Sequence, residues 1–333
     1  MRTLTLSLAL LSAAVPAVAA EINIYSQRQP ELIQPVLDAF TADTGIDVNI
    51  AYLEKGLTER LTAEGARSPA DIILTVDISR LAEAVAAGVT QPVTSTVLTD
   101  AIPAALRDPG NQWFGVTTRA RVVYASKARV ADGEITTYED LADPKWRGRI
   151  CTRSGTHEYN LALMAAIIHH NGAEYAQSWA EGLKANLARK PQGNDRAQIK
   201  AIWAGECDIA LGNTYYMGLM LEDPEQQPWA DAVRIVYPAF QNGGTHMNVS
   251  GVAMTKASKN ADNALKFMEY LVSDKAQEVY AQINYEFPVR ADVPSSDVVA
   301  SWGTFVPDDA NLMDLAALRA EALRLMEVVD FDG

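Results

Sequence analysis

The most constraining feature of the sequence is a regular alternation of strand-like and helix-like segments over residues 21–88. Short stretches that alternate apolar and polar residues, or are wholly apolar, are typical of strands, and amphipathic stretches with helical spacing lie between them. The expected strands cover residues 21–25, 46–52 and 71–75, and the expected helices cover residues 32–44, 57–64 and 78–87. This spacing indicates βαβ units, so we predict an α/β fold with mainly parallel sheets flanked by helices.

The length of 333 residues exceeds what one hydrophobic core usually supports, so we expect two lobes. Two strand-like stretches, residues 113–116 and 122–125, are joined through residues 117–121, and we interpret them as a crossing between the lobes. Residues 233–238 and 248–254 are interpreted as strands that return, which gives a hinge of several strands. The predicted first lobe comprises residues 21–120 and about 245–292, and the second about 121–244 and 293–333. Two such lobes form a cleft that can close on a ligand.

The first twenty residues have the pattern of a secretory signal peptide. Arg2 precedes a mainly apolar stretch, and small residues follow at positions 16–20, with no lipobox cysteine. We therefore expect export, with the mature chain beginning near Ala20 or Glu21. The formal net charge of -14 argues against nucleic acid or an anionic membrane as partner, because both require a basic surface.

Two stretches place a tyrosine eight residues after a cysteine. Cys151 precedes Tyr159, and Cys207 precedes Tyr215, which Tyr216 follows directly. Two cysteines in an exported protein favour a disulfide, and two buried free thiols are the alternative. If the cysteines pair across neighbouring strands, the tyrosines emerge at a similar level on turns beyond the sheet, where ligand sites of open α/β sheets lie. By themselves the tyrosines indicate either one binding site or unrelated packing.

Several motifs resemble those of the bacterial periplasmic ferric-ion-binding proteins, class II members of the periplasmic solute-binding superfamily. The resemblance covers essentially the whole mature chain, and its most specific motif is Gly212-Asn213-Thr214-Tyr215-Tyr216-Met217. The other matching segments are Ile24-Tyr25-Ser26-Gln27-Arg28, Phe40 with Thr44-Gly45-Ile46, Pro69-Ala70-Asp71-Ile72, Thr118-Arg119-Ala120-Arg121, Pro144-Lys145-Trp146-Arg147-Gly148-Arg149 and residues 155–160. The resemblance implies a monomeric periplasmic receptor that captures ferric ion between its lobes and delivers it to an inner-membrane ABC importer.

The resemblance also implies the metal ligands. In that family the tyrosines that match Tyr159, Tyr215 and Tyr216 bind Fe3+ as phenolates. Fe3+ is a hard, highly charged ion, so anionic oxygen suits it better than thiolate or imidazole. Because a free tyrosine has a pKa near 10, the charge of the metal itself must favour the phenolate form.

The sequence departs from part of the family at Gln29 and Pro30, where many members have a His-Tyr pair that binds the metal. It matches instead relatives with three tyrosines and a synergistic anion such as carbonate. Arg28 and Arg121 match basic residues that hold the anion or the phenolates, and an arginine fork suits a planar anion. Gln29 is expected to add a hydrogen bond, and Arg119 is expected to face solvent.

Alternative interpretations remain at this stage. His157, two residues before Tyr159, is a candidate to approach the ion, but a polar loop histidine is the favoured interpretation; Glu54 and Glu158 are candidates for additional oxygen ligands. A second hypothesis keeps the fold but replaces iron with an organic solute such as thiamine, a polyamine or a phosphonate, with the tyrosines stacked on an organic cation. A third is an exported enzyme, but the sequence has no Ser/His/Asp or Cys/His arrangement, no phosphate-binding glycine loop and no zinc signature, so we expect no catalysis.

Overall fold

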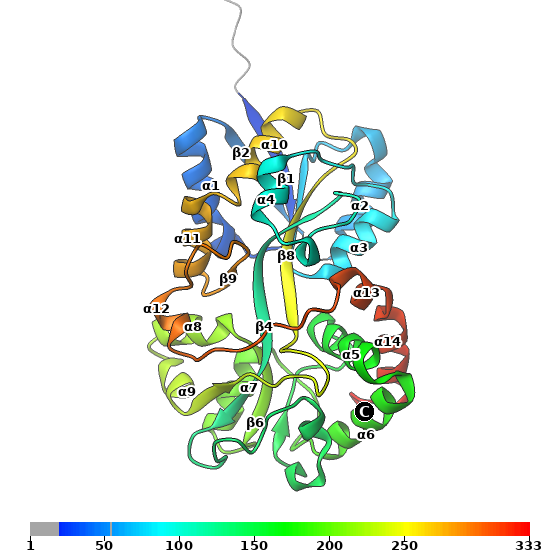
Figure 1. Cartoon of the computed structure of the whole chain (residues 1–333), viewed down its shortest axis with the longest axis vertical. Coiled ribbons are helices and arrows are strands. Elements are labelled where there is room, and N and C mark those ends of the chain that lie inside the picture. Colours follow the sequence, from blue (N-terminus) through cyan, green and yellow to red (C-terminus); the bar gives the residue numbers. More distant parts are fainter. Residues whose placement is uncertain (1–19, 54) are drawn as a thin grey trace, which may run out of the picture.

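A computed structural model describes residues 20–53 and 55–333. Apart from residue 20, the predicted signal peptide lies outside the described residues and stays a prediction. Two lobes follow one another along the long axis of the molecule, each with strands inside and helices outside (Figure 1). The predicted two-lobed α/β fold is confirmed, and the residue boundaries of the lobes remain a prediction.

The first lobe contains the strands that the alternating pattern predicted. β1 (Glu21–Ser26) pairs in parallel with β2 (Asp47–Tyr52) and β3 (Ile72–Thr75). The sheet continues with β8 (Met247–Met254), antiparallel to β3, and β4 (Phe114–Ser126), antiparallel to β8. It is therefore more mixed than predicted. The helices of this lobe are α1 (Pro30–Thr44), α2 (Leu57–Glu64), α3 (Ile78–Ala86), α4 (Thr96–Ala101), α10 (Ala261–Tyr270) and α11 (Asp274–Ile283).

Helix α1 illustrates how local sequence defines these elements. Pro30 occupies its first position, where a missing N–H costs nothing. Ile33, Val36, Leu37 and Phe40 recur at helical spacing and are buried in the core of the first lobe. Gly45 ends the helix in the left-handed conformation, at φ 69°, which favours glycine.

The second lobe is built around the other half of β4. β6 (Ile209–Asn213) runs antiparallel to β4 and parallel to the short strand β5 (Ile150–Cys151). β7 (Val233–Val236) pairs with the end of β4 in this lobe, whereas β9 (Phe287–Pro288) pairs with Thr117 and Thr118 of β4 in the sheet of the first lobe. The remaining helices are α5 (Glu158–Asn171), α6 (Ala173–Ala185), α7 (Asp195–Trp203), α8 (Tyr215–Glu222), α9 (Gln227–Asp231), α12 (Asp297–Ala300), α13 (Leu312–Ala317) and α14 (Arg319–Val328).

Strand β4 connects the lobes. The sequence predicted two strands joined through residues 117–121, but β4 is one strand of 13 residues, all of them buried. At about 3.3 Å per residue it is roughly 40 Å long, enough to extend through both sheets. Figure 1 shows β4 and β8 side by side across the waist of the molecule, so this pair is the hinge.

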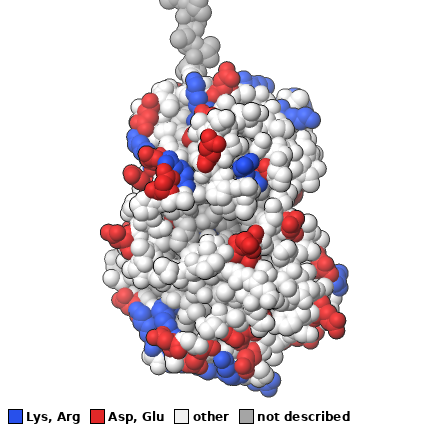
Figure 2. All heavy atoms as spheres, viewed as in Figure 1, with Lys and Arg blue, Asp and Glu red and all other residues white. Residues whose placement is uncertain are grey.

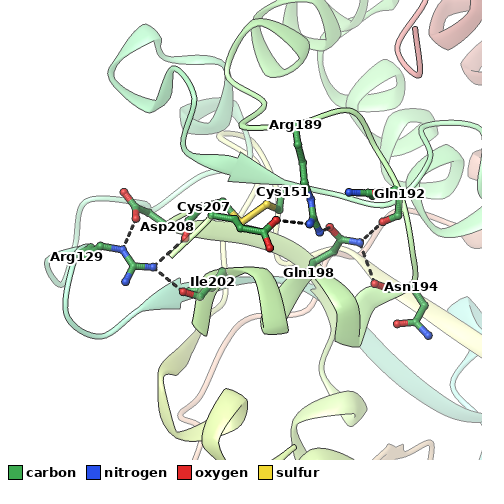
Figure 3. The surroundings of a disulfide bond; sticks show 10 residues. Arg129, Cys151, Arg189, Gln192, Asn194, Gln198, Ile202, Cys207 and Asp208 are labelled. Carbon is green, nitrogen blue, oxygen red and sulfur yellow. Dashed lines mark hydrogen bonds and ion pairs between the residues drawn. A yellow bond between two sulfur atoms is a disulfide. The ribbon is translucent and has the colours of Figure 1, made fainter. Parts of the chain in front are cut away.

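The predicted disulfide between Cys151 and Cys207 is present in the second lobe. Both cysteines are buried, and their Cα atoms are 5.9 Å apart. Cys151 is the last residue of β5, and Cys207 lies two residues before β6, so the bond joins two neighbouring strands at their base. Figure 3 shows the bond beside Arg129, whose guanidinium donates to the carbonyl of Cys207 at 2.9 Å.

Charged side chains are distributed over the surface of both lobes. On the face shown in Figure 2, acidic and basic groups are interspersed, and the surface is hollowed between the lobes. Within residues 20–53 and 55–333, no helix is both long enough and apolar enough to span a bilayer.

We predict that replacing both cysteines, as in Cys151→Ala/Cys207→Ala, destabilises the protein. The bond closes a sequence separation of 56 residues, for which chain entropy gives a loss of about 4 kcal/mol in the free energy of unfolding. Denaturant titration of the variant and the wild type measures this loss, and chemically reduced wild type serves as the control. Equal unfolding midpoints for the variant and the oxidised wild type would contradict the prediction.

Candidate functional site

The three predicted ligand tyrosines lie at the N-termini of two helices. Tyr159 is the second residue of α5, and Tyr215 and Tyr216 are the first two residues of α8. The sequence had predicted a turn for this pair, but the helix begins directly after Thr214. Successive helical side chains are about 100° apart, so two neighbours at a helix start can face one site.

The hydroxyl groups of these tyrosines converge. The Tyr159 and Tyr215 hydroxyl oxygens are 3.4 Å apart, and the ring centroids of Tyr215 and Tyr216 are 4.2 Å apart. Tyr159 and Tyr215 are buried, and Tyr216 is partly buried. The convergence follows from the sheet, because parallel strands β5 and β6 lie side by side and precede α5 and α8, respectively.

The tyrosines line a cleft of about 500 Å³ between the lobes. Both lobes contribute to its walls, as expected for a ligand site between domains. The charged lining residues are six cations and two carboxylates: Arg28, Lys55, Arg80, Arg119, Arg153, Arg196, Glu158 and Glu286. This excess of positive charge favours anionic ligands.

Burial keeps the tyrosine hydroxyls protonated in the protein alone. It raises the pKa of Tyr159 and Tyr215 well above the ordinary value of 10, and it also raises the pKa of Tyr216. Electrostatic repulsion from a neighbouring phenolate raises these pKa values further. Tyr215 raises the pKa of Tyr159, and Tyr216 raises the pKa of Tyr215. The positive charge of Arg119 opposes it by lowering the pKa of Tyr159 and Tyr215.

Arg119 is the main residue that the sequence interpretation missed. It was expected to face solvent, but it is 2% exposed and lines the cleft. Its Nη1 donates to Ser250 Oγ at 3.0 Å, while its Nε and Nη2 have no hydrogen-bond partner among the described residues. Residues 117, 119 and 121 of one strand share a face, so the period-two rule could have grouped Arg119 with Arg121.

Arg28 also lines the cleft, and its guanidinium is paired. It binds both carboxylate oxygens of Glu286, and its Nη1 donates to Ser250 Oγ at 2.9 Å. Glu286 also accepts from the Thr117 hydroxyl at 3.0 Å. Burial disfavours the charge on Arg28, but Glu286 outweighs it, so the pKa of Arg28 is raised. Arg28 and Arg119 therefore lie side by side, joined by one serine.

Arg121 lies behind the tyrosines and is not among the cleft-lining residues. It donates to Asp195 at 2.6 Å, to Asn160 at 2.7 Å and to Asn213 at 3.1 Å. Arg153 donates to the other oxygen of Asp195 at 3.1 Å and does line the cleft. Asp195 thus joins two arginines, and the Arg121 guanidinium lies 5.8 Å from the Tyr159 ring centre.

The remaining candidate residues have different surroundings. Gln29 is exposed and lines the cleft. Glu158 forms an ion pair with Arg80 across the cleft. His157 Nδ1 accepts from the Tyr159 N–H at 3.2 Å, and burial lowers the pKa of His157 to about 3. Glu54 falls outside the described residues.

The fold and the cleft define a class of protein that binds solutes between two lobes. Residues 25–278 match the bacterial extracellular solute-binding protein family, and the chain belongs to it. The chain is 46% identical to iron uptake protein A1 of a Synechocystis strain over 314 residues, which cover 93% of this chain and 87% of that protein. It is 30% identical to the major ferric iron-binding protein of Neisseria meningitidis over 294 residues, 86% of each chain.

Solved structures agree with this assignment. The apo ferric ion-binding protein A of Pasteurella haemolytica superposes with a TM-score of 0.91 at 50% identity, covering 95% of this chain and 99% of that one. A Trichodesmium protein in complex with iron and citrate superposes with a TM-score of 0.88 at 44% identity, covering 94% and 100%. The resemblance inferred from the sequence motifs is confirmed.

We predict that Asp195→Asn destabilises the protein at neutral pH by about 3 kcal/mol, because it leaves the buried Arg121 and the partly buried Arg153 without their carboxylate. Arg121 and Arg153 outweigh burial and hold the pKa of Asp195 below its ordinary value. The carboxylate therefore stabilises the fold above its unfolded-state pKa of about 4, and this contribution is lost as the pH falls through the lower folded-state pKa.

Denaturant unfolding of wild type and variant between about pH 3 and 7 tests this prediction. The difference between the two proteins should narrow at the acid end. Asp292→Asn is the control, because Asp292 pairs with Arg290 at the exposed surface and should show no comparable loss. A difference that stays constant across the pH range would contradict the role of the Asp195 charge.

Proposed function

We propose that this chain is a periplasmic receptor that captures ferric ion in the cleft between its lobes and delivers it to an ABC importer. The observation that supports this most is the convergence of three tyrosines in a cleft lined by cations. The names of the relatives, which refer to iron uptake and ferric iron binding, point the same way. Its signal-peptide pattern and its family support a periplasmic location.

In this proposal Tyr159, Tyr215 and Tyr216 are the metal ligands. Their raised pKa values mean that they are neutral before the ion arrives. A trivalent ion favours the phenolate forms by its own charge, so binding releases up to three protons. Three phenolates balance the charge of Fe3+, whereas a divalent or soft ion gains less from them.

We further propose that a small anion completes the site beside Arg119. Once three phenolates balance the ion, the excess cations of the cleft still require negative charge. The free Nε and Nη2 of Arg119 form the side edge of a guanidinium, which binds a planar oxyanion such as carbonate through two parallel hydrogen bonds. Arg28 lies next to this edge, Gln29 at the cleft wall can add a hydrogen bond, and Arg121 holds the tyrosines from behind.

We predict that metal-free protein titrated with Fe3+ in bicarbonate buffer develops a visible tyrosinate-to-iron charge-transfer band. The band should saturate at one ion per chain, because the tyrosines form one site. Tyr159→Phe and Tyr215→Phe should each weaken the band and release about one proton fewer per ion. Absorption and proton release, both with a ferric chelate as the iron source, are the measurements.

Tyr237→Phe is the matched control for these variants. Tyr237 is in the second lobe, outside the cleft, and its hydroxyl has no hydrogen-bond partner among the described residues. Its loss should leave the band unchanged. A colourless protein whose thermal stability does not respond to iron would overturn the ferric proposal, and organic solutes would then be screened by thermal shift.

We predict that Arg119→Gln removes the dependence of iron retention on bicarbonate. In the wild type, depleting bicarbonate should speed the loss of iron to a chelator, by roughly tenfold or more for a charged hydrogen-bonded pair. Arg119→Lys keeps the charge but loses the fork, so it should retain part of the dependence. If Arg119→Gln responds to bicarbonate as the wild type does, the anion does not bind at Arg119.

A further inference from the structure

Each of the two helices that present the tyrosines is attached to the first lobe through one carboxylate. On α5, this carboxylate is Glu158, the first residue of the helix and the neighbour of Tyr159. Glu158 forms an ion pair with Arg80 of α3, across the cleft. The two side chains are 23% and 20% exposed, so water screens this pair less than a pair on the open surface.

On α8, the corresponding carboxylate is Glu222, the last residue of the helix. The hydroxyl of Tyr285 donates a hydrogen bond to it. Burial and the carboxylate of Glu222 raise the pKa of Tyr285 to about 12, so this hydroxyl keeps its proton at neutral pH. The Tyr285 ring lies directly on the α8 backbone at Gly218, where an added Cβ would be 2.0 Å from the ring.

Tyr285 is itself held by the first lobe. On one side of it, Asn284 donates to the carbonyl of Leu32 at 2.8 Å. On the other side, Glu286 pairs with Arg28. The backbone of Tyr285 has φ +56°, an uncommon value for a residue other than glycine, which is maintained only where the surroundings fix it. Tyr285 therefore extends from fixed points of the first lobe onto a helix of the second.

We propose that Arg80–Glu158, across the cleft, and Tyr285–Glu222, outside it, are contacts between the lobes that hold the two tyrosine-bearing helices against the first lobe. Arg80 and Tyr285 are then positioning residues. Figure 1 shows α5 and α8 on opposite sides of β4, so the two contacts flank the hinge strand. We expect that rotation of the lobes about β4 and β8, which opens the cleft, moves α5 and α8 away from the first lobe and breaks both contacts. The consequence for iron rests on the function proposed above: the contacts slow release of the ion without touching it.

Release kinetics test this consequence. Iron-loaded wild type, Arg80→Gln, Tyr285→Phe and the double variant are mixed with an excess of chelator, and loss of the charge-transfer band is followed. Each single variant should release iron about two- to tenfold faster, as expected for one partly exposed polar contact. The two contacts, Arg80–Glu158 and Tyr285–Glu222, are formed by different residues on different helices, so the effects should multiply in the double variant. The band of the loaded protein should keep its wavelength, since the ligands are intact.

Two control variants match the changes but lie away from the cleft. Arg290 is 21% exposed and pairs with Asp274, and the Tyr270 hydroxyl donates to Asp43 at 2.9 Å. Arg290→Gln and Tyr270→Phe should release iron at the wild-type rate. Release from the double variant no faster than from these controls would overturn the proposal.

A second measurement on metal-free protein separates this inference from the ferric proposal. Both native cysteines are in the disulfide, so cysteines introduced at exposed Val97 in α4 and Val328 in α14 can be spin-labelled. Double electron–electron resonance gives the distance between the labels. The double variant should show a broader distribution with longer distances than the wild type. An unchanged distribution would overturn the proposed role of the two contacts between the lobes, whereas a shifted distribution with no response to iron would overturn only the ferric function.

Discussion

Three phenol groups lie together in one cleft, and under the proposed function they are neutral when the cleft is empty and anionic when it holds a trivalent ion. Burial raises the pKa of Tyr159, Tyr215 and Tyr216, which prevents three unbalanced negative charges from forming without a metal. The same burial strengthens the attraction between phenolates and the ion, because little water competes. Much of the structure around the cleft can be understood as support for these two charge states.

The support comes from the sheet of the second lobe. β5 and β6 are parallel neighbours, and each precedes a helix that carries proposed ligand tyrosines in its first two residues. The disulfide joins these two strands at their base, and Asp195 with Arg121 fixes the region behind the tyrosine rings. The hydroxyl positions therefore depend on elements with little freedom to move independently. Such rigidity is what a site with several ligands to one ion requires.

The sequence predicted the elements of the first lobe well because their signals are local. The strands and helices of residues 21–88 appear within a few residues of their predicted positions, and α1 ends at Thr44, the last residue of the expected helix. The continuity of β4 could not be seen in the same way. Its polar centre is buried because Thr117 and Arg119 find partners in Glu286 and Ser250, more than 100 residues away. Pairing between residues this far apart produces no periodic pattern of apolar and polar residues in the sequence.

The sequence predicted only part of the geometry of the candidate site, and the reason is again physical. The motif around Tyr215 located the tyrosines, but propensity did not indicate that α8 begins directly at Tyr215. For the arginines, the sequence could not assign partners. Arg28 has its own carboxylate in Glu286, and Arg121 has Asp195. Arg119, by contrast, has two guanidinium nitrogens without a partner among the described residues; the period-two pattern could have grouped Arg119 with Arg121, but it could not show which nitrogens stay unpaired.

The free edge of Arg119 has an energetic consequence for the hinge. Arg119 on β4 and Arg28 both donate to Ser250 on β8, yet Glu286 balances only Arg28. A buried guanidinium with unpaired N–H groups destabilises the protein, by about 1–3 kcal/mol for each unsatisfied group. An anion bound there would remove that cost in the loaded state alone. Because this destabilisation of the protein disappears only when the ligand is bound, it increases the gain in free energy on binding.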